Sequence, residues 1–326
     1  MKLYSNEDNK RLIASMISKG REPHSVIITG EKGSGRKALG RYLAAALLCE
    51  EGTGTPCGKC KSCRMAEHDA HPDLITAQSN ANGNYLVADI RQIVSDAVIT
   101  PNEGKLKVVM IPDLDRSVNT LVAVQNILLK LVEEPPEHCV IIMTAVSKET
   151  FLPTIISRVV CFAAQPCTPA QAEEWLTVSG KYGQDDIIRA AACCGGNFGR
   201  CVEYLEGSEL PAAFECARKV CEAVTADSEY DMLCAFTEVQ DKKPLLRQTL
   251  VFAAEIFRAS AVISAGAEPG HCCAPDMAAK LARRLGSSVS ERYYSAVTEA
   301  ILRIDCNVSR TLAVNDLCCT LSGNAV

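Results

Sequence analysis

The sequence predicts an α/β fold in its first half and an all-helical second half. Short apolar runs recur in the first 165 residues, and segments with helical periodicity separate them. This alternation indicates a parallel sheet with a Rossmann-like architecture. A glycine-rich turn follows the first apolar run, at the point where such folds begin a helix. From residue 166 onward only helical periodicity remains.

The predicted elements follow one another in a regular order. Apolar side chains three and four residues apart predict a first helix over residues 7–20. The predicted strands are Val26–Thr29, Lys107–Ile111, Cys139–Thr144 and Val159–Phe162. The predicted helices between them are Ala38–Cys49, Asp89–Val98 and Asn119–Val132. Residues 50–73 are rich in glycine, cysteine and lysine, so we expect an irregular insertion there.

Three domains are expected along the chain. Prolines 166 and 169 mark a break after the α/β core of residues 1–165. A small helical domain is predicted over residues 166–207 and a longer helical domain over residues 208–326. Breaks in the helical pattern of the last domain fall near Lys243–Pro244, Gly266–Gly270 and Gly286–Ser287.

The composition indicates an ordinary cytoplasmic protein. Hydrophobic residues make up 48% and the formal net charge is -5, so bulk charge provides no attraction for nucleic acid. No apolar run reaches membrane-spanning length, and the N-terminus lacks a signal-peptide pattern. The 18 cysteines in 326 residues do not fit a short secreted disulfide scaffold, so most are expected to be free and buried. The adjacent pairs Cys193–Cys194, Cys272–Cys273 and Cys318–Cys319 are alternative redox sites.

A degenerate phosphate-binding loop follows the first strand. Gly30 and Gly35, with Gly33 between them, have the spacing of G-x-x-x-x-G-K-S/T, a motif that binds nucleotide phosphates. The lysine position holds Arg36, and Lys37 replaces the hydroxyl that would bind Mg²⁺. Because a cation stands where a metal ligand is needed, we expect no metal-assisted hydrolysis. Binding of ATP or ADP without hydrolysis stays open, through Arg36 and the loop backbone.

A second loss follows the strand Lys107–Ile111. An active NTPase of this kind needs two acidic residues there, and Pro112 replaces the first of them. Asp113 could mimic the acid that activates water, but it has no metal ligand beside it. The two losses agree, and catalytic turnover of ATP by this chain is therefore not expected.

Four cysteines in the insertion have the spacing of a structural zinc site. They are Cys49, Cys57, Cys60 and Cys63. Thiolates three residues apart can chelate one tetrahedral ion, and four of them close its coordination shell. A closed shell leaves no position for substrate, so the expected Zn²⁺ is structural. His68 and His71 are alternative ligands, and free surface cysteines without any metal are the other alternative.

Two arginines are candidates for contact with a nucleotide. Arg158 comes after a predicted strand and turn at Phe151–Ile156, a position from which it could reach a neighbour's γ-phosphate. Arg200 opens a helix after the glycine-rich segment 195–199 and could face the nucleotide cleft. The alternative for each is an exposed arginine with no such role.

Together these segments resemble one family, the clamp-loader subunits of bacterial replicative DNA polymerase III, of the AAA+ class. Asn126–Pro136 is similar to the family's N-A-L-L-K-x-L-E-E-P-P motif, and Ser157–Val159 is similar to its S-R-C finger motif. Thr144 matches the family's sensor position. The cysteine quartet and the following His71–Asp73 match the family's insertion. The resemblance is specific from residue 7 to residue 207 and looser beyond.

Within this family, delta-prime subunits combine the zinc site and the finger arginine with degenerate nucleotide motifs. The departures at Arg36, Lys37 and Pro112 are similar to that branch. The resemblance implies a non-hydrolysing subunit with an AAA+ core, a helical lid and a helical collar that oligomerises. It implies gamma/tau and delta subunits as partners, and the sliding clamp and primer–template DNA through the complex. It also implies that Arg158 acts in trans at a neighbouring ATP site.

Two other functions stay open on the residues alone. The chain could be an active clamp-loader ATPase of the gamma/tau type that uses Arg36 in place of lysine. It could instead be a zinc-dependent nucleic-acid-binding module. Lys59, Lys61 and Arg64 would supply the positive charge for such a module, but residues 49–73 contain no aromatic side chain for base stacking.

Overall fold

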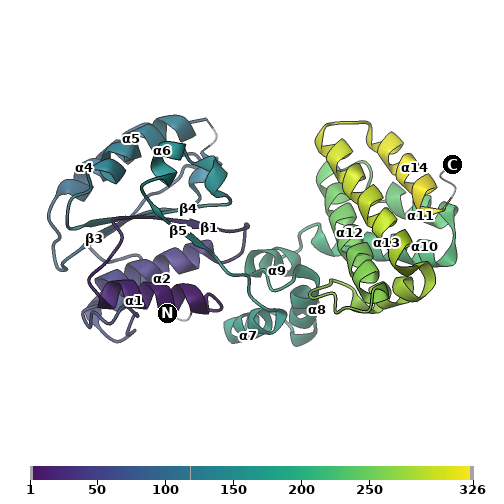
Figure 1. The fold of residues 1–326 in the computed structure, drawn as a ribbon, viewed down its shortest axis with the longest axis horizontal. Helices are drawn as coiled ribbons and strands as arrows, with labels where there is room; N and C mark the ends of the chain where they lie inside the picture. The colour runs from purple at the N-terminus through teal and green to yellow at the C-terminus, as the bar shows by residue number, and fades with distance from the viewer. Residues whose placement is uncertain (1–2, 118, 324–326) are drawn as a thin grey trace. The chain divides into compact units, whose positions relative to one another are not determined.

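The computed structural model describes residues 3–117 and 119–323, and the chain forms two compact units. These are Met1–Cys167 and Thr168–Val326. The first unit consists of a parallel sheet between helices, and the described part of the second unit consists of helices and their connections (Figure 1). The predicted fold class, an α/β core followed by an all-helical region, is confirmed.

One parallel sheet of five strands organises the first unit. The strands are β1 (Ser25–Thr29), β2 (Leu74–Thr76), β3 (Lys107–Ile111), β4 (Cys139–Ala145) and β5 (Val160–Ala163). Their order is β2-β3-β4-β1-β5, and every neighbouring pair is parallel. All residues of β3 and β4 are buried, which is why both strands are almost continuous apolar runs. Because parallel strands end at the same edge, the segments that follow β1, β3 and β4 adjoin there.

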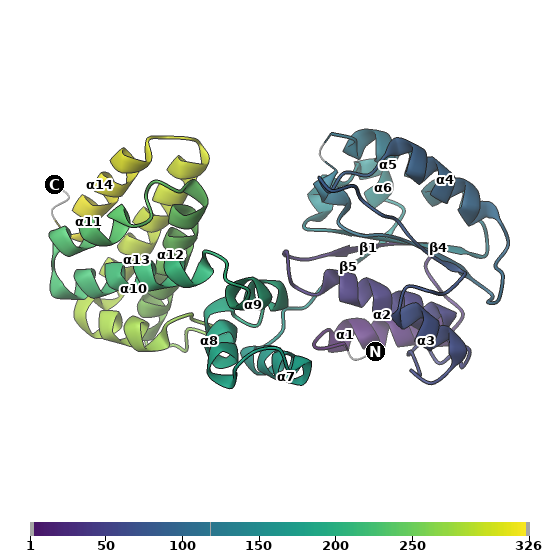
Figure 2. The same cartoon turned by 180° about the vertical axis from the view of Figure 1, so that it is seen from behind.

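Helices cover both faces of this sheet (Figures 1 and 2). They are α1 (Glu7–Ser18), α2 (Arg36–Leu48), α3 (Lys61–Glu67), α4 (Val87–Val98), α5 (Leu121–Glu133) and α6 (Pro153–Ile156), with short 3-10 helices at Leu114–Arg116 and Lys148–Thr150. Helices α1 and α2 share one hydrophobic core with Val26 and Ile28 of β1. Helices α4, α5 and α6 share the other core with Ile27, because successive strand residues face opposite sides.

Three elements of this unit differ from the sequence prediction. The insertion expected to be irregular contains α3, because the Cys60 side chain caps this helix by accepting the N–H of Cys63. The segment before Arg158, expected as a strand and turn, is the helix α6, which begins at Pro153. Strand β2 escapes prediction because three residues at the sheet edge are too few to show a periodicity.

The buried carboxylate of Asp73 anchors the edge of the sheet beside the insertion. Its oxygens accept backbone N–H bonds from Asn102, Glu103 and Gly104 at 2.5, 2.9 and 2.9 Å. Burial works to raise the pKa of this carboxyl, but the N–H donors outweigh burial and hold the pKa below its ordinary value. The ionised Asp73 therefore fixes the segment that leads into β3.

The second unit contains eight helices within its described residues. They are α7 (Pro169–Ser179), α8 (Gln184–Cys194), α9 (Phe198–Leu205), α10 (Leu210–Ala226), α11 (Glu229–Thr237), α12 (Lys243–Ser264), α13 (Pro275–Asp305) and α14 (Arg310–Leu321). Gly286, with a φ of +73°, interrupts α13 at one of the predicted breaks. No helix in the described part of the chain is long and apolar enough to cross a membrane. The lid and collar boundaries, at residues 165 and 207, stay predictions.

Candidate functional site

The glycines predicted to bind phosphate form one tight turn between β1 and α2. A Cβ on Gly30 would lie 2.6 Å from Ser34 Oγ and 3.0 Å from Ala164 Cβ. Gly33 and Gly35 have φ angles of +85° and +86°, which other residues rarely adopt. The backbone angles therefore favour glycine at positions 33 and 35, and a side chain at position 30 would crowd those of Ser34 and Ala164.

Arg36 is the first residue of α2, and its guanidinium is buried inside the unit. The side chain is only 5% exposed. Its Nε and Nη2 atoms donate to Oδ1 of Asp113 at 3.0 and 2.6 Å, and Nη1 donates to the carbonyl oxygen of Gly30 at 2.7 Å. The N–H groups of Arg36, which we expected to bind nucleotide phosphates, thus donate to acceptors of the protein itself.

Three cations surround the carboxylate of Asp113, which follows β3. Besides Arg36, Lys37 Nζ lies 2.8 Å and Arg116 Nε 3.3 Å from its Oδ2 atom. The Asp113 N–H donates to Oγ1 of Thr144 at 2.8 Å, so the predicted sensor residue holds the same segment. Burial works to raise the pKa of Asp113, but hydrogen bonds from Lys37 and Arg36 hold the pKa below its ordinary value. The carboxylate is therefore ionised at neutral pH.

We call Arg36, Lys37, Asp113 and Arg116 the Asp113 cluster. Both carboxylate oxygens of Asp113 accept bonds from protein cations, so neither is free to bind Mg²⁺ or to orient a water. A divalent cation at this point would also be repelled by the neighbouring positive side chains. Arg116 was not predicted as a member of this cluster, and its only signal in the sequence is its position three residues after Asp113.

Arg158 follows α6 and contacts the end of α5. Its Nη1 atom donates to the carbonyl oxygen of Thr154 at 2.9 Å, and Nη2 lies 3.5 Å from Oε1 of Glu133. Arg158 and Glu133 are both nearly half exposed, and exposed ion pairs of this kind contribute little to stability. Arg158 can therefore exchange Glu133 for another anion at a small cost in free energy.

Arg200 lies in α9, within the helical unit. Its guanidinium carbon is 5.5 Å from the centroid of the Phe252 ring, which is the geometry of a cation–π contact. Its Nη2 atom is buried and has no hydrogen-bond partner in the described part of the chain. The contact of Arg200 with a nucleotide stays a prediction.

The four cysteines predicted to bind metal lie together. The four Sγ atoms all lie within 4.8 Å of one another, and those of Cys57 and Cys63 are 3.9 Å apart. Sulfurs bound 2.3 Å from one tetrahedral Zn²⁺ lie about 3.8 Å apart, so the arrangement fits a metal such as zinc. The alternative ligands His68 and His71 are not part of this group of four sulfurs. Nδ1 of His71 accepts the N–H of Asp73 at 3.0 Å, and His68 directly follows α3.

Backbone N–H groups support the sulfurs of this metal centre. Lys59 and Cys60 donate to Cys57 Sγ at 3.4 and 3.3 Å, and Cys63 donates to Cys60 Sγ at 3.3 Å. Burial raises the pKa of the Cys63 thiol to about 12, so a bound metal would displace a proton from it. Cys49 directly follows α2, whereas Cys60 and Cys63 belong to the start of α3. A metal here would join these two helices.

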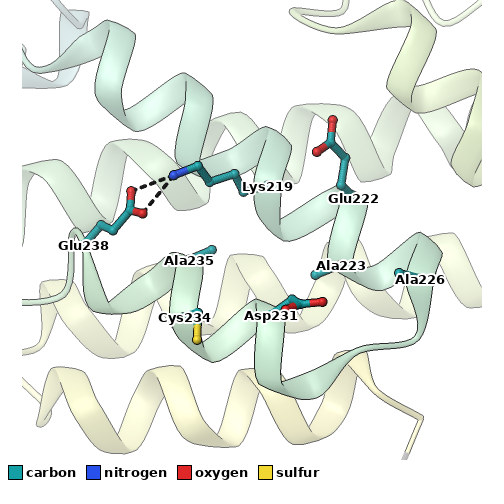
Figure 3. Close-up of a pocket in the computed structure, with 8 residues that line it drawn as sticks. All are labelled: Lys219, Glu222, Ala223, Ala226, Asp231, Cys234, Ala235 and Glu238. Carbon is teal, nitrogen blue, oxygen red and sulfur yellow. Dashed lines mark hydrogen bonds and ion pairs between the residues drawn. The ribbon is translucent and has the colours of Figure 1, made fainter.

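A hollow in the helical unit lies between α10 and α11 (Figure 3). Its charged lining residues are Lys219, Glu222, Asp231 and Glu238. Lys219 Nζ pairs with both oxygens of Glu238, at 2.8 and 2.9 Å, and the Glu222 carboxylate points away from that pair (Figure 3). Exposed pairs of this kind are ordinary surface structure, so the candidate site is in the α/β unit.

Comparison with known proteins identifies the family. A family model described as "DNA polymerase III, delta subunit" matches residues 5–168. The chain belongs to this family. It is 27% identical to the delta' subunit of DNA polymerase III from Escherichia coli K12, over 72% of this chain and 69% of that protein. The predicted relationship to the delta and delta-prime clamp-loader subunits is confirmed.

Further similar proteins match stretches of different length. The delta' subunit of Bacillus subtilis 168 is 30% identical over 51% of this chain and 49% of its own length. The tau subunit of E. coli K12 is 34% identical over 46% of this chain, but the match spans only 23% of tau. A solved gamma-subunit-related protein from Thermotoga maritima aligns over 97% of this chain and 98% of its own, with 19% identity and a TM-score of 0.41.

The metal centre predicts about one zinc ion per chain in protein purified without chelators, measured by atomic emission. We expect Cys57→Ser to lose the ion and to lower the thermal midpoint, because three thiolates no longer close the coordination shell. Cys161→Ser is the matched control, since Cys161 is exposed on β5 and outside the metal centre. Wild-type protein without zinc would show that the cysteines are simply free thiols.

The Asp113 cluster predicts unequal effects of removing its members. Asp113→Ala should lower the free energy of unfolding by about 3–5 kcal/mol, because the buried Arg36 guanidinium loses its anion. The control Arg116→Gln removes a half-exposed partner of the same carboxylate and should cost about 0–1 kcal/mol. Denaturant unfolding at neutral pH measures both, and equal losses would contradict the buried pair.

The pH dependence gives a second readout of the same variants. The pKa of Asp113 in the folded state lies below its ordinary value of 3.8. The ionised carboxylate therefore stabilises the folded protein in full at pH values above 3.8. This stabilisation should disappear as the pH falls through the lower folded-state pKa. The difference between wild type and Asp113→Ala should therefore shrink only in strong acid.

Proposed function

We propose that this chain is a non-hydrolysing, delta-prime-type subunit of a DNA polymerase III clamp loader. Membership of the family and the match to delta' over 72% of the chain support its place among clamp-loader subunits. The Asp113 cluster is the observation that supports the proposed lack of ATP hydrolysis. Its carboxylate is bound by Arg36, Lys37 and Arg116, so a metal would have to displace one of these cations and lie among the positive charges of the others.

In this proposal Arg158 is a finger that completes the ATP site of an adjacent motor subunit. Its exposure and its weak pair with Glu133 support this role, because the guanidinium can change partners. A guanidinium binds phosphate oxygens through two parallel hydrogen bonds and stabilises the charge of the transition state. Hydrolysis by the motor subunit would then depend on assembly with this chain.

The rest of the proposal concerns partners and domains. The partners are gamma/tau and delta subunits, with the sliding clamp and primer–template DNA reached through the complex, in the cytoplasm. Residues 166–207 form the lid and residues 208–326 the oligomerising collar. Zn²⁺ at the cysteine centre is structural. The loop Gly30–Lys37 binds ATP or ADP weakly at most, because Arg36 donates to Asp113 and Gly30.

The finger is tested in a complex reconstituted with the motor and clamp-opening subunits of the same organism. Arg158→Ala should lower the DNA-stimulated ATPase rate by about tenfold or more, because a guanidinium that stabilises the transition state is lost. Assembly, followed by gel filtration, should be unchanged because the side chain is exposed. Glu133→Gln is the matched control, since it removes the partner of Arg158 and keeps the arginine. If the complex with Arg158→Ala hydrolyses ATP at the full rate, the proposed finger role of Arg158 is wrong.

The two rival functions are separated by measurements on the isolated chain. An active ATPase would release phosphate steadily from ATP and Mg²⁺, which the engaged carboxylate of Asp113 opposes. A nucleic-acid-binding insertion would retard DNA in a gel. Lys61 Nζ, one of its cations, already pairs with Glu103 at 2.8 Å, which lowers the charge available to DNA.

A further inference from the structure

A polar pocket of about 290 Å³ lies at the carboxyl ends of β2 and β3, beside the Asp113 cluster. Its charged lining residues are Lys37, Arg41, Arg116, Asp69 and Asp113, and its uncharged polar side chains include those of Thr76, Gln78 and Ser79. The pocket shares Lys37 with the degenerate loop and Asp113 with the segment after β3. The three glycines of that loop are not among its lining residues, so the pocket is separate from the turn that would cradle a nucleotide.

Cations outnumber carboxylates around this pocket. Arg41 Nη2 pairs with Oδ2 of Asp69 at 2.6 Å, while Lys37 and Arg116 pair with Asp113. Arg36 binds the same Asp113 from the interior. Four cations thus share two carboxylates, and the excess of positive charge favours an anionic ligand.

Lys37 and Arg116 can bind a ligand without leaving Asp113 unpaired. Arg36 keeps two hydrogen bonds to that carboxylate, whereas the side chains of Lys37 and Arg116 are 48% and 49% exposed. Lys37 Nζ and Arg116 Nε both lie within 3.3 Å of the same oxygen, Oδ2. They are therefore close enough together for one tetrahedral oxyanion to bridge them.

Thr76, the last residue of β2, also lines the pocket. Its Oγ1 atom is buried and has no hydrogen-bond partner within residues 3–117 and 119–323. Burying a hydroxyl without a partner costs free energy, which a ligand oxygen would recover. The wall beside it is fixed, because the Tyr85 hydroxyl donates to the carbonyl oxygen of Pro112 and the Tyr85 N–H donates to Ser117 Oγ.

We propose that this pocket binds a phosphate group, held by Lys37 and Arg116, with Arg41 and the hydroxyl of Thr76 as further donors. A phosphate carries the charge and the several acceptor oxygens that this set of donors requires. A free phosphate, a nucleotide and the backbone of a nucleic acid all present this group. The proposal does not depend on the finger role of Arg158 or on the lack of ATP hydrolysis.

The test is calorimetric titration of the full zinc-loaded chain with inorganic phosphate at constant ionic strength. Wild type should show saturable binding, and the double variant Lys37→Gln/Arg116→Gln should bind about tenfold more weakly or worse, because two charged donors are lost. Thr76→Val keeps the shape of the side chain and should weaken binding severalfold. Arg91→Gln is the matched control, because Arg91 is an exposed cation of α4 outside the pocket.

Competition identifies the source of the phosphate. Displacement of inorganic phosphate by ADP without metal would indicate a nucleotide, and displacement by a short single-stranded oligonucleotide would indicate a nucleic-acid backbone. Displacement by neither would leave free phosphate as the ligand. Each of these outcomes supports the pocket. No saturable binding by wild type, or equal binding by wild type, the folded double variant and Thr76→Val, would overturn the proposal.

Discussion

The buried ion pair between Arg36 and Asp113 is the interaction on which the candidate site depends. It joins the first residue of α2 to the end of β3, and the Thr144 hydroxyl of β4 accepts the Asp113 N–H beside it. Removing a guanidinium and a carboxylate from water costs several kcal/mol for each ion, which good geometry and further hydrogen bonds must offset. Here Arg36 also donates to Gly30, so the pair fixes the loop after β1 as well. The loops after β1 and β3 are thus joined to each other and to strand β4 by groups of the protein.

The same helix has a second fixed point at its other end. Arg36 begins α2, and Cys49 directly follows its last residue. Cys49 belongs to the metal centre, whose other sulfurs come from the segment that forms α3 and the turn before it. With zinc bound, α2 would be held by an ion pair at its N-terminus and by a metal at its C-terminus. Such a helix would be held at both ends by groups of the protein, which agrees with the proposed non-hydrolysing role.

The sequence predicted the layers of the fold better than the contacts of the site. Strand β3 has the predicted bounds because a fully buried strand is a continuous apolar run, whereas the three residues of β2 are too few to form a pattern. The cysteine quartet was predictable because chelation imposes a spacing on the chain. The direction of the Arg36 side chain was not predictable, because it depends on Asp113, 77 residues away in the sequence. The sequence thus showed that metal ligands are missing, but not which groups replace them.

The Asp113 cluster consists of a fixed part and an exchangeable part. Arg36 is buried and cannot leave its carboxylate without becoming an uncompensated charge in a low dielectric. Lys37 and Arg116 are half in water, so replacing Asp113 by another anion costs them little. Lys37 therefore has two properties that the proposals use: its charge beside Asp113 opposes a divalent cation, and its amine is exposed toward the adjoining pocket. The proposed lack of hydrolysis and the proposed phosphate site thus involve the same side chain, because both depend on the positive charge of Lys37.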